Sequence, residues 1–316
     1  MPGPAIFRRH RRHRLLTATT MSIRHLLPLL ATLLLAGCFH DTRPEPPVAP
    51  PPAKLKIGLA LGGGAAKGFA HIGVIKMLEA SGIQPDVVAG TSAGSVVGAL
   101  YASGMDAFEL QQTAFGLDEA KIRDVRLFSG GLVQGQALQD YVNELVHKQP
   151  IERLRMPFAA VSTELENGKR MFFVRGNTGR AVRASSSIPG VFEPVEINGK
   201  HYVDGGVVSP IPVDAARRLG ADFVIAVDIS SAPDGSNPQG MMDIVGQSIT
   251  IMGRQLGEQE TARADVVIRP AIDGIGAVDF EQRNQAILAG EKAALAAMPL
   301  IRARLAERAA ASVATP

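Results

Sequence analysis

The stretch DVVAGTSAGSVVGAL, residues 86–100, decides the fold of this 316-residue chain. Residues 86–90 begin with Asp86 and continue as a short apolar run typical of a buried strand, and residues 93–103 are typical of a helix. Between them lies a Gly-x-Ser-x-Gly pentapeptide with Ser92 at its centre. In this context the pattern predicts a nucleophile elbow, a sharp turn that exposes a serine hydroxyl at a helix N-terminus. The alternative is a plain tight turn.

The same alternation of strand and helix continues outward from this stretch. A strand is expected at 57–61, a glycine-rich turn at 62–68 and a helix at 69–80. This βαβα order favours an α/β fold with a parallel sheet and crossover helices. Asn-Gly pairs at 167–168 and 198–199 predict hairpins. Further strands are expected at 223–228 and 266–269, and helices at 107–115, 136–147, 214–219, 241–262 and 281–307.

The turn after the first strand reads LGGGAAKG from Leu61 to Gly68. Three successive glycines, Gly62, Gly63 and Gly64, leave backbone N–H groups open to a phosphate or to the oxyanion of an acyl-transfer reaction. A dinucleotide-binding Gly-x-Gly-x-x-Gly would need glycine where Lys67 stands. A Walker loop would need Gly-Lys-Ser/Thr, and the order here is Lys67-Gly68. Both nucleotide interpretations are weak, so no nucleotide partner is expected.

An acidic residue at a strand end completes the candidate site. Asp204 closes the predicted strand 201–203 and is followed by Gly205 and Gly206. A serine nucleophile needs a base. No histidine follows Asp204, and His201 lies on the other face of its strand by alternation. The sequence therefore allows a Ser92–Asp204 dyad and disfavours a Ser-His-Asp triad.

With these motifs in order, the chain resembles the patatin-like phospholipase family, especially its bacterial single-domain members. The resemblance rests on Gly62–Gly64 with Lys67, on the pentapeptide from Gly90 to Gly94, and on Asp204 with Gly205 and Gly206. The stretches 184–192 and 217–222 also look like the family. One departure is Ser209, where relatives often carry Asn.

The resemblance implies a three-layer fold in which helices flank a central, mainly parallel sheet, over a domain at 55–307. It implies Ser92 as the nucleophile, Asp204 as its direct base and an oxyanion hole from the N–H groups of Gly62, Gly63 and Gly64. The expected activity is hydrolysis of acyl esters of phospholipids, lysophospholipids or related lipids, with no metal and no other cofactor. The alternative is a catalytically idle lipid-binding or envelope-assembly lipoprotein on the same fold.

The N-terminal region predicts export. From Met21 a short basic start and an apolar run at 26–35 have the layout of a signal peptide within a leader at 1–37. The apolar run is too short for the roughly 20 residues that span a bilayer. The first 20 residues do not fit this layout, so we expect Met21 to be the true start, the alternative being a long basic n-region.

Leu35-Ala-Gly-Cys38 resembles the lipobox of bacterial lipoproteins, which implies lipidation of Cys38 and a membrane anchor. Phe39 at the next position favours the outer membrane, with the domain facing the periplasm. The proline-rich residues 38–54 predict an extended tether. Residues 308–316 are expected to be a disordered tail.

Composition excludes further classes of function. Of the 33 basic residues, six precede Cys38, whereas all 30 acidic residues follow it, so the net charge of +3 becomes −3 without the leader. Nucleic-acid binding therefore loses its main support. The chain has no Trp, and its one cysteine allows no intramolecular disulfide. No group of residues has metal-ligand spacing.

Overall fold

The computed structural model describes residues 54–118, 124, 133–231, 239–276 and 278–314. These ranges do not include the predicted leader, Cys38 or the tether up to residue 53. They also leave out most of residues 116–134, a stretch with little periodicity in sequence that is a candidate lid. The strands are β1 (Ile57–Leu61), β2 (Val87–Thr91), β3 (Phe158–Glu164), β4 (Arg170–Phe173), β5 (Val195–Ile197), β6 (Lys200–Asp204), β7 (Phe223–Val227) and β8 (Val266–Ile268). The α-helices are α2 (Phe69–Ala80), α3 (Ala93–Ser103), α4 (Ala107–Phe115), α5 (Gln136–Leu145), α6 (Thr178–Ser185), α7 (Val213–Arg218), α8 (Met241–Thr261) and α9 (Arg283–Ala314).

All described strands join one sheet in the order β5-β6-β3-β2-β1-β7-β8, and β4 also pairs with β3. The strands from β3 to β8 in this order run parallel. The smaller strands β4, β5 and β6 pair antiparallel at the β3 side. The predicted α/β class with a central, mainly parallel sheet is confirmed.

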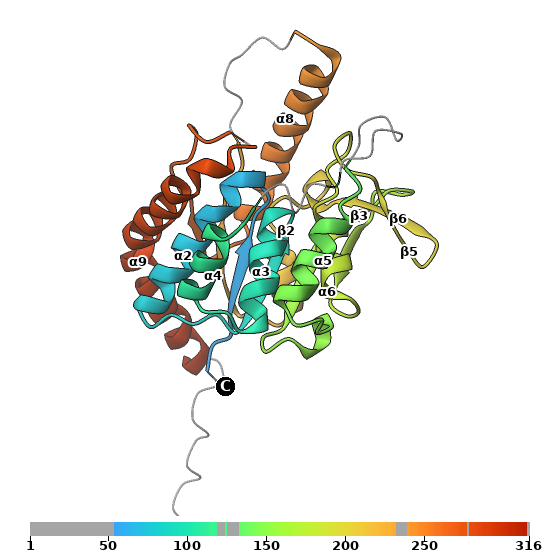
Figure 1. The fold of residues 1–316 in the computed structure, drawn as a ribbon. Helices are drawn as coiled ribbons and strands as arrows, with labels where there is room; N and C mark the ends of the chain where they lie inside the picture. Colours follow the sequence, from blue (N-terminus) through green and yellow to red (C-terminus); the bar gives the residue numbers. More distant parts are fainter. Residues whose placement is uncertain (1–53, 119–123, 125–132, 232–238, 277, 315–316) are drawn as a thin grey trace, which may run out of the picture. The chain divides into compact units, whose positions relative to one another are not determined.

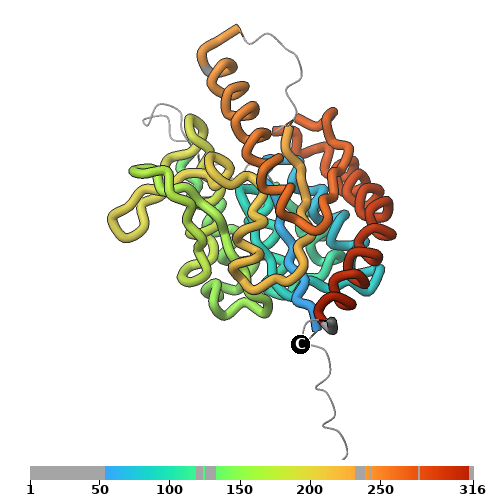
Figure 2. Tube along the Cα trace, turned by 180° about the vertical axis from the view of Figure 1, so that it is seen from behind, coloured from blue at the N-terminus to red at the C-terminus, as the bar shows by residue number. Residues whose placement is uncertain are grey.

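The parallel strands are apolar because both of their faces are covered. In β1, Leu59 and Leu61 pack into the larger core, shared with α2, α3 and α9. Ala60 between them faces a second core, to which α7 contributes Ala215 and Ala216. Figure 1 shows α2 to α6 and α9 in front of the sheet, and Figure 2 shows the opposite side of the molecule. The three layers predicted from the family resemblance are therefore present.

Local differences from the sequence prediction have physical reasons. The hairpin at Asn198-Gly199 forms, with positive φ at both residues as its turn requires. Helix α6 was not predicted, although Asn177 caps it by accepting a hydrogen bond from Arg180 N at 2.7 Å. The prediction of a disordered tail at 308–316 is wrong as far as Ala314, since α9 continues to that residue. Its alanine-rich sequence favours helix to the end.

Helix α8 lies largely outside the sandwich of layers and is seen projecting at the top of Figure 1. It exposes large apolar side chains, namely Met241, Ile244, Val245, Ile251 and Met252. Its C-terminal turn is different, since Gly257 and Glu260 are buried. Within the described residues, no helix combines the length and apolarity needed to cross a membrane.

Candidate active site

Ser92 lies at the bend between β2 and α3, as the elbow prediction requires. It is the N-cap residue of α3, with φ 53° and ψ −124°. A positive φ is unusual for a non-glycine residue and marks local backbone strain that the surrounding structure must hold. Its side chain is nearly buried, with 6% of the residue exposed. The bend thus presents a serine hydroxyl at the N-terminal end of a helix.

The two flanking glycines are explained by the tightness of this bend. A Cβ on Gly90 would lie 2.2 Å from the carbonyl oxygen of Gly94, and one on Gly94 would lie 2.1 Å from that of Leu61. Any side chain at either position would therefore push β2, α3 or β1 apart. The predicted supporting roles of Gly90 and Gly94 are consistent with this geometry.

Asp204 is brought close to Ser92 by the sheet. Thr91, the residue before Ser92, pairs with Val161 of β3, and the next residue of β3, Ser162, pairs with Asp204. The turn after Asp204 packs tightly on β3, since a Cβ on Gly205 would lie 2.2 Å from the carbonyl oxygen of Val161. Serine and carboxylate are more than a hundred residues apart in sequence but lie two strands apart in the sheet.

The carboxylate of Asp204 is held in a buried position. Its Oδ1 accepts a hydrogen bond from Gly206 N at 2.7 Å, and a Cβ at position 206 would lie only 3.0 Å from the same oxygen. Burial raises the pKa of Asp204 to about 6. Interactions with the Ser92 hydroxyl and the Gly206 N–H lower this pKa, but by less than burial raises it. Oδ2 is buried with no partner at full hydrogen-bond geometry. The contact with Ser92 is therefore loose, as is common for catalytic pairs without substrate.

The histidines near the site do not serve Ser92. His71 is fully buried, and its Nε2 lies 2.8 Å from the carbonyl oxygen of Gly62. A carbonyl only accepts, so Nε2 carries the proton and donates it to the glycine turn. Burial lowers the pKa of His71 to about 4, so the ring is neutral at pH 7. His201 is exposed and contacts Glu166. The expectation that neither histidine completes a triad agrees with this geometry.

The glycine turn lies beside the nucleophile. A Cβ on Gly63 would lie 3.2 Å from the Cβ of Ser92. However, Gly62 N donates to the carbonyl of Val227 and Gly63 N to that of Pro210, both at 3.0 Å. Among the described residues, the N–H of Gly64 makes no hydrogen bond. Of the three predicted oxyanion donors, two amides thus hold the turn in place and the third is free.

The side chain of Lys67 binds the segment that follows β7. It lies in the 3-10 helix η2 (Ala65–Gly68), is 4% exposed, and its Nζ donates to the hydroxyl of Ser231 at 3.0 Å. Burial lowers the pKa of Lys67, and Asp273 acts in the opposite direction. This contact ties the glycine turn to the segment that follows β7.

Sequence reasoning missed Ser185, which contacts the nucleophile. Its Oγ accepts a hydrogen bond from Ser92 N at 3.0 Å and donates to the carbonyl of Val161 at 2.5 Å. It lies at the C-terminal end of α6. The cap Asn177 followed by apolar residues at 181, 182 and 184 was the available signal for that helix.

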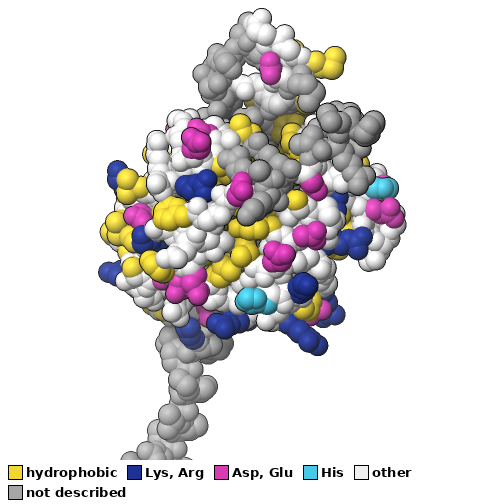
Figure 3. Space-filling model, viewed as in Figure 1, with side chains coloured by type: hydrophobic (Ala, Val, Ile, Leu, Met, Phe, Trp, Pro, Cys, Tyr) yellow, Lys and Arg dark blue, Asp and Glu magenta, His cyan; other side chains and the backbone are white. Residues whose placement is uncertain are grey.

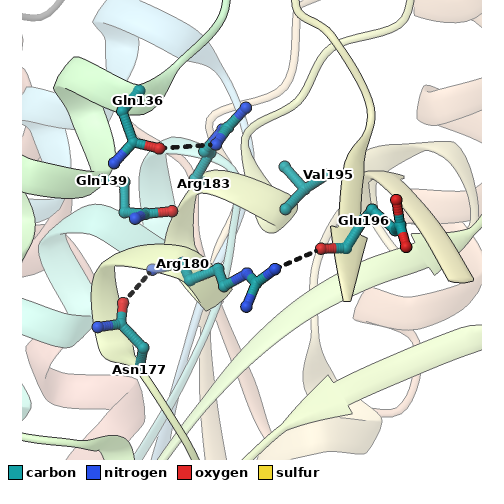
Figure 4. Close-up of a pocket in the computed structure, with 7 residues that line it drawn as sticks. All are labelled: Gln136, Gln139, Asn177, Arg180, Arg183, Val195 and Glu196. Atoms are coloured by element: carbon teal, nitrogen blue, oxygen red, sulfur yellow. Dashed lines mark hydrogen bonds between the residues drawn. The ribbon is translucent and has the colours of Figure 1, made fainter. Parts of the chain in front are cut away.

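A cavity of about 400 Å³ lies beside α6 but does not include the candidate pair (Figure 4). Its lining comes from α5, the cap and body of α6, and β5, and consists of Gln136, Gln139, Asn177, Arg180, Arg183, Val195 and Glu196. Arg183 donates to Gln136 and Arg180 to the carbonyl of Glu196. These polar contacts lie in the wall of the cavity, and neither Ser92 nor Asp204 is among the residues that line it.

No group of three or more His, Cys, Asp or Glu residues within the described ranges is placed to hold a metal ion. On the face drawn in Figure 3, basic, acidic and apolar side chains are interspersed. The chemistry available at the bend is therefore that of a serine, a carboxylate and backbone amides.

Comparison with known proteins agrees with this arrangement. A family model described as patatin-like phospholipase matches residues 59–217, about half of the chain. An uncharacterized NTE family protein of Mycobacterium tuberculosis is 37% identical over 184 residues, which cover 57% of this chain and 51% of the relative. A lysophospholipase NTE1 of Coccidioides immitis is 31% identical over 269 residues, covering 75% of this chain but only 17% of the relative. The chain thus spans about half, or much less, of these relatives.

Among solved structures, VipD from Legionella pneumophila has the same fold. The match has a TM-score of 0.55 at 14% identity and covers 79% of this chain and 67% of VipD. At that identity the likeness concerns the fold alone. The family match, by contrast, contains Ser92 and Asp204 on the elements that bring them together. The chain belongs to the patatin-like phospholipase family.

Proposed function

We propose that the protein is a serine acyl hydrolase that cleaves fatty-acyl esters of phospholipids or lysophospholipids. Ser92 is the nucleophile and Asp204 its base. The observation that carries this proposal is the strained elbow of Ser92 beside a buried carboxylate whose pKa is raised to about 6. A carboxylate with a pKa near the working pH is suited to proton transfer. The lysophospholipase name of a relative favours a lipid ester over other acyl esters.

In the proposed reaction, the Ser92 hydroxyl attacks the ester carbonyl and its proton passes to Asp204. The tetrahedral intermediate collapses, and the leaving alcohol takes the proton from Asp204. Water then attacks the acyl-enzyme and gives a proton to Asp204, and the fatty acid leaves as the proton returns to Ser92 Oγ. No histidine is required, since the carboxylate serves both half-reactions.

The oxyanion of this intermediate needs N–H donors. The free N–H of Gly64 is the donor we assign from the glycine turn, while Gly62 and Gly63 position it through their own hydrogen bonds. The N-terminus of α3 adds its dipole at Ser92. One well-placed donor contributes roughly 3–4 kcal/mol to catalysis.

A pH profile tests the role of Asp204. The base must be ionised to accept the proton, and its pKa is raised from 3.8 to about 6. We therefore expect kcat/KM for a soluble acyl ester to fall about tenfold per pH unit below about pH 6. A profile that stays flat down to about pH 4.5, where an ordinary aspartate is still ionised, would contradict this role.

Labelling with a fluorophosphonate separates the enzyme from an idle lipid-binding protein on the same fold. An active serine hydrolase reacts covalently with the probe, whereas an idle relative does not. We expect labelling of the wild type and of His201→Ala. Persistent absence of labelling and of fatty-acid release from phospholipid and lysophospholipid vesicles would favour the idle protein.

We further propose that the protein is a lipoprotein that faces the periplasm, anchored in the outer membrane through Cys38. The lipobox-like sequence 35–38 supports this. In a Gram-negative host fed labelled palmitate, the wild type should incorporate label and sediment with membranes. Cys38→Ser should do neither. Equal incorporation by the variant would refute the anchor without affecting the enzymatic proposal.

A further inference from the structure

Glu260 is a buried carboxylate outside the Ser92–Asp204 pair. It lies in the last turn of α8 and is 2% exposed. Its Oε1 accepts a hydrogen bond from the Ser209 hydroxyl at 2.5 Å, and its Oε2 accepts one from Ile211 N at 2.8 Å. Both oxygens thus bind the same short segment, 209–211. A buried acid is unfavourable unless it is fully satisfied, so this carboxylate strongly constrains the segment.

The segment 209–211 contacts both halves of the proposed catalytic centre. The carbonyl of Ser209 accepts a hydrogen bond from Thr91 Oγ1 at 2.8 Å, and Thr91 directly precedes the nucleophile. The carbonyl of Pro210 accepts the N–H of Gly63 at 3.0 Å, in the turn that holds Gly64. Ser209 N also donates to Gly205 O at 2.8 Å, in the turn after Asp204. A shift of this segment would therefore move nucleophile, base and oxyanion turn relative to one another.

Two arginines lie near the Glu260 carboxylate, in addition to its hydrogen bonds with Ser209 and Ile211. The Arg170 guanidinium lies 3.5 Å from its Oε1 and that of Arg263 lies 4.0 Å away. Both arginines also bind Asp214. Burial raises the pKa of Glu260, and hydrogen bonds from Ser209 and Ile211 act against this rise. The titratable and charged groups that face Glu260 are thus Arg170, Arg263 and Asp214.

We propose that Glu260 is a positioning residue for the acyl-transfer reaction, which sets the distance between Ser92 and the oxyanion turn through Ser209 and Ile211. The inference rests on the proposed function. It also gives a reason for serine at position 209, because a short hydroxyl reaches the carboxylate while the backbone carbonyl beside it holds Thr91.

The test compares two substitutions on the same helix. In Glu260→Gln the amide oxygen can still accept from Ile211 N, but the NH2 group can only donate. The Ser209 hydroxyl must then turn from donor to acceptor, and its short bond to a carboxylate becomes a weaker neutral bond at nearly constant side-chain size. In the control Glu258→Gln, the side chain is exposed and pairs with Arg254. Active sites are counted by titration with a fluorophosphonate, and kcat per titrated site and KM are then measured with a soluble acyl ester.

We expect Glu260→Gln to lower kcat per titrated site by about 10- to 100-fold with little change in KM, because misplacement of reacting groups has effects of that size. Glu258→Gln should match the wild type. A residue that only stabilises the fold would reduce the number of titratable sites and leave kcat per site unchanged, and that result would overturn the proposal.

Ser209→Ala covers the case in which Glu260→Gln does not fold. It removes one hydroxyl and leaves the bond from Ile211 N to Glu260, so we expect a smaller loss in kcat per site, about 3- to 10-fold. The two substitutions together should lose less than the product of their separate effects, because they act on one interaction. Wild-type kcat per site in Ser209→Ala would overturn the proposal. Absence of wild-type labelling would instead refute the proposed function.

Discussion

Replacing Ser92 with alanine is expected to lower kcat for acyl-ester hydrolysis by about 10⁵-fold or more and to abolish fluorophosphonate labelling. Loss of the attacking hydroxyl removes the covalent route altogether, and losses of this size follow removal of a serine nucleophile. The measurement is fatty-acid release together with in-gel detection of the probe. The fold should persist, because the bend is held by its backbone contacts with Ser185 and the packing of Gly90 and Gly94.

Ser103→Ala provides the matched control. Ser103 ends the same helix, and its hydroxyl donates to the carbonyl of Leu100 away from the bend. It should retain wild-type kcat and full labelling. If Ser92→Ala kept its labelling, another residue would be the nucleophile and the assignment of the site would be wrong.

Replacing Asp204 with asparagine is expected to lower the activity by about 10²- to 10⁴-fold and to stabilise the protein at the same time. Loss of a general base lowers rates by about 10²- to 10⁴-fold. The folded-state pKa of Asp204 is raised, so its ionised form disfavours folding above about pH 6, and this penalty is absent below the unfolded pKa near 4. Asparagine removes it, so the free energy of unfolding at about pH 8 should rise by on the order of 1–3 kcal/mol.

Thermal melting checks this sign. We expect the melting temperature of Asp204→Asn to exceed that of the wild type by at least about 2 °C at pH 8 and the difference to vanish near pH 4. Asp214→Asn should instead have a lower melting temperature than the wild type at pH 8. Burial raises the pKa of Asp214, but hydrogen bonds from Arg263 and Arg170 outweigh burial and lower it. A lower melting temperature for Asp204→Asn than for the wild type at pH 8 would show that burial does not disfavour the ionised carboxylate of Asp204.

The fold was predictable where local pattern and burial agree. The strands around Ser92 are apolar on both faces, and glycines mark their turns, so 57–61 and 87–91 could be placed closely. Helix α6 was missed because it has only 8 residues and a glycine in its first turn, although the cap Asn177 and the apolar residues at 181, 182 and 184 were available as a signal. The end of α9 was misjudged because the last residues of the chain were taken for a tail, although four of residues 308–314 are alanines that favour helix.

The candidate pair could be predicted because each residue lies in a local motif at the end of a strand. Glu260 and Ser185 could not, since each acts on a segment tens of residues away. Ser185 lies in the family-like stretch 184–192, but nothing in that stretch indicates its contact with Ser92. The three glycines of the turn look equivalent in sequence. Only the fold shows that Val227 and Pro210 occupy the amides of Gly62 and Gly63 and leave that of Gly64 free.

The most direct test of the central claim is to trap the acyl-enzyme. The wild-type protein is quenched with acid while it hydrolyses a short-chain acyl ester. It is then digested with trypsin, which cleaves after Lys76 and Lys121, and the adduct is located by mass spectrometry. We predict an added acyl group on the peptide that spans residues 77–121, with fragmentation placing it on Ser92. The absence of this adduct when hydrolysis is measurable, or its location on another residue, would contradict the account.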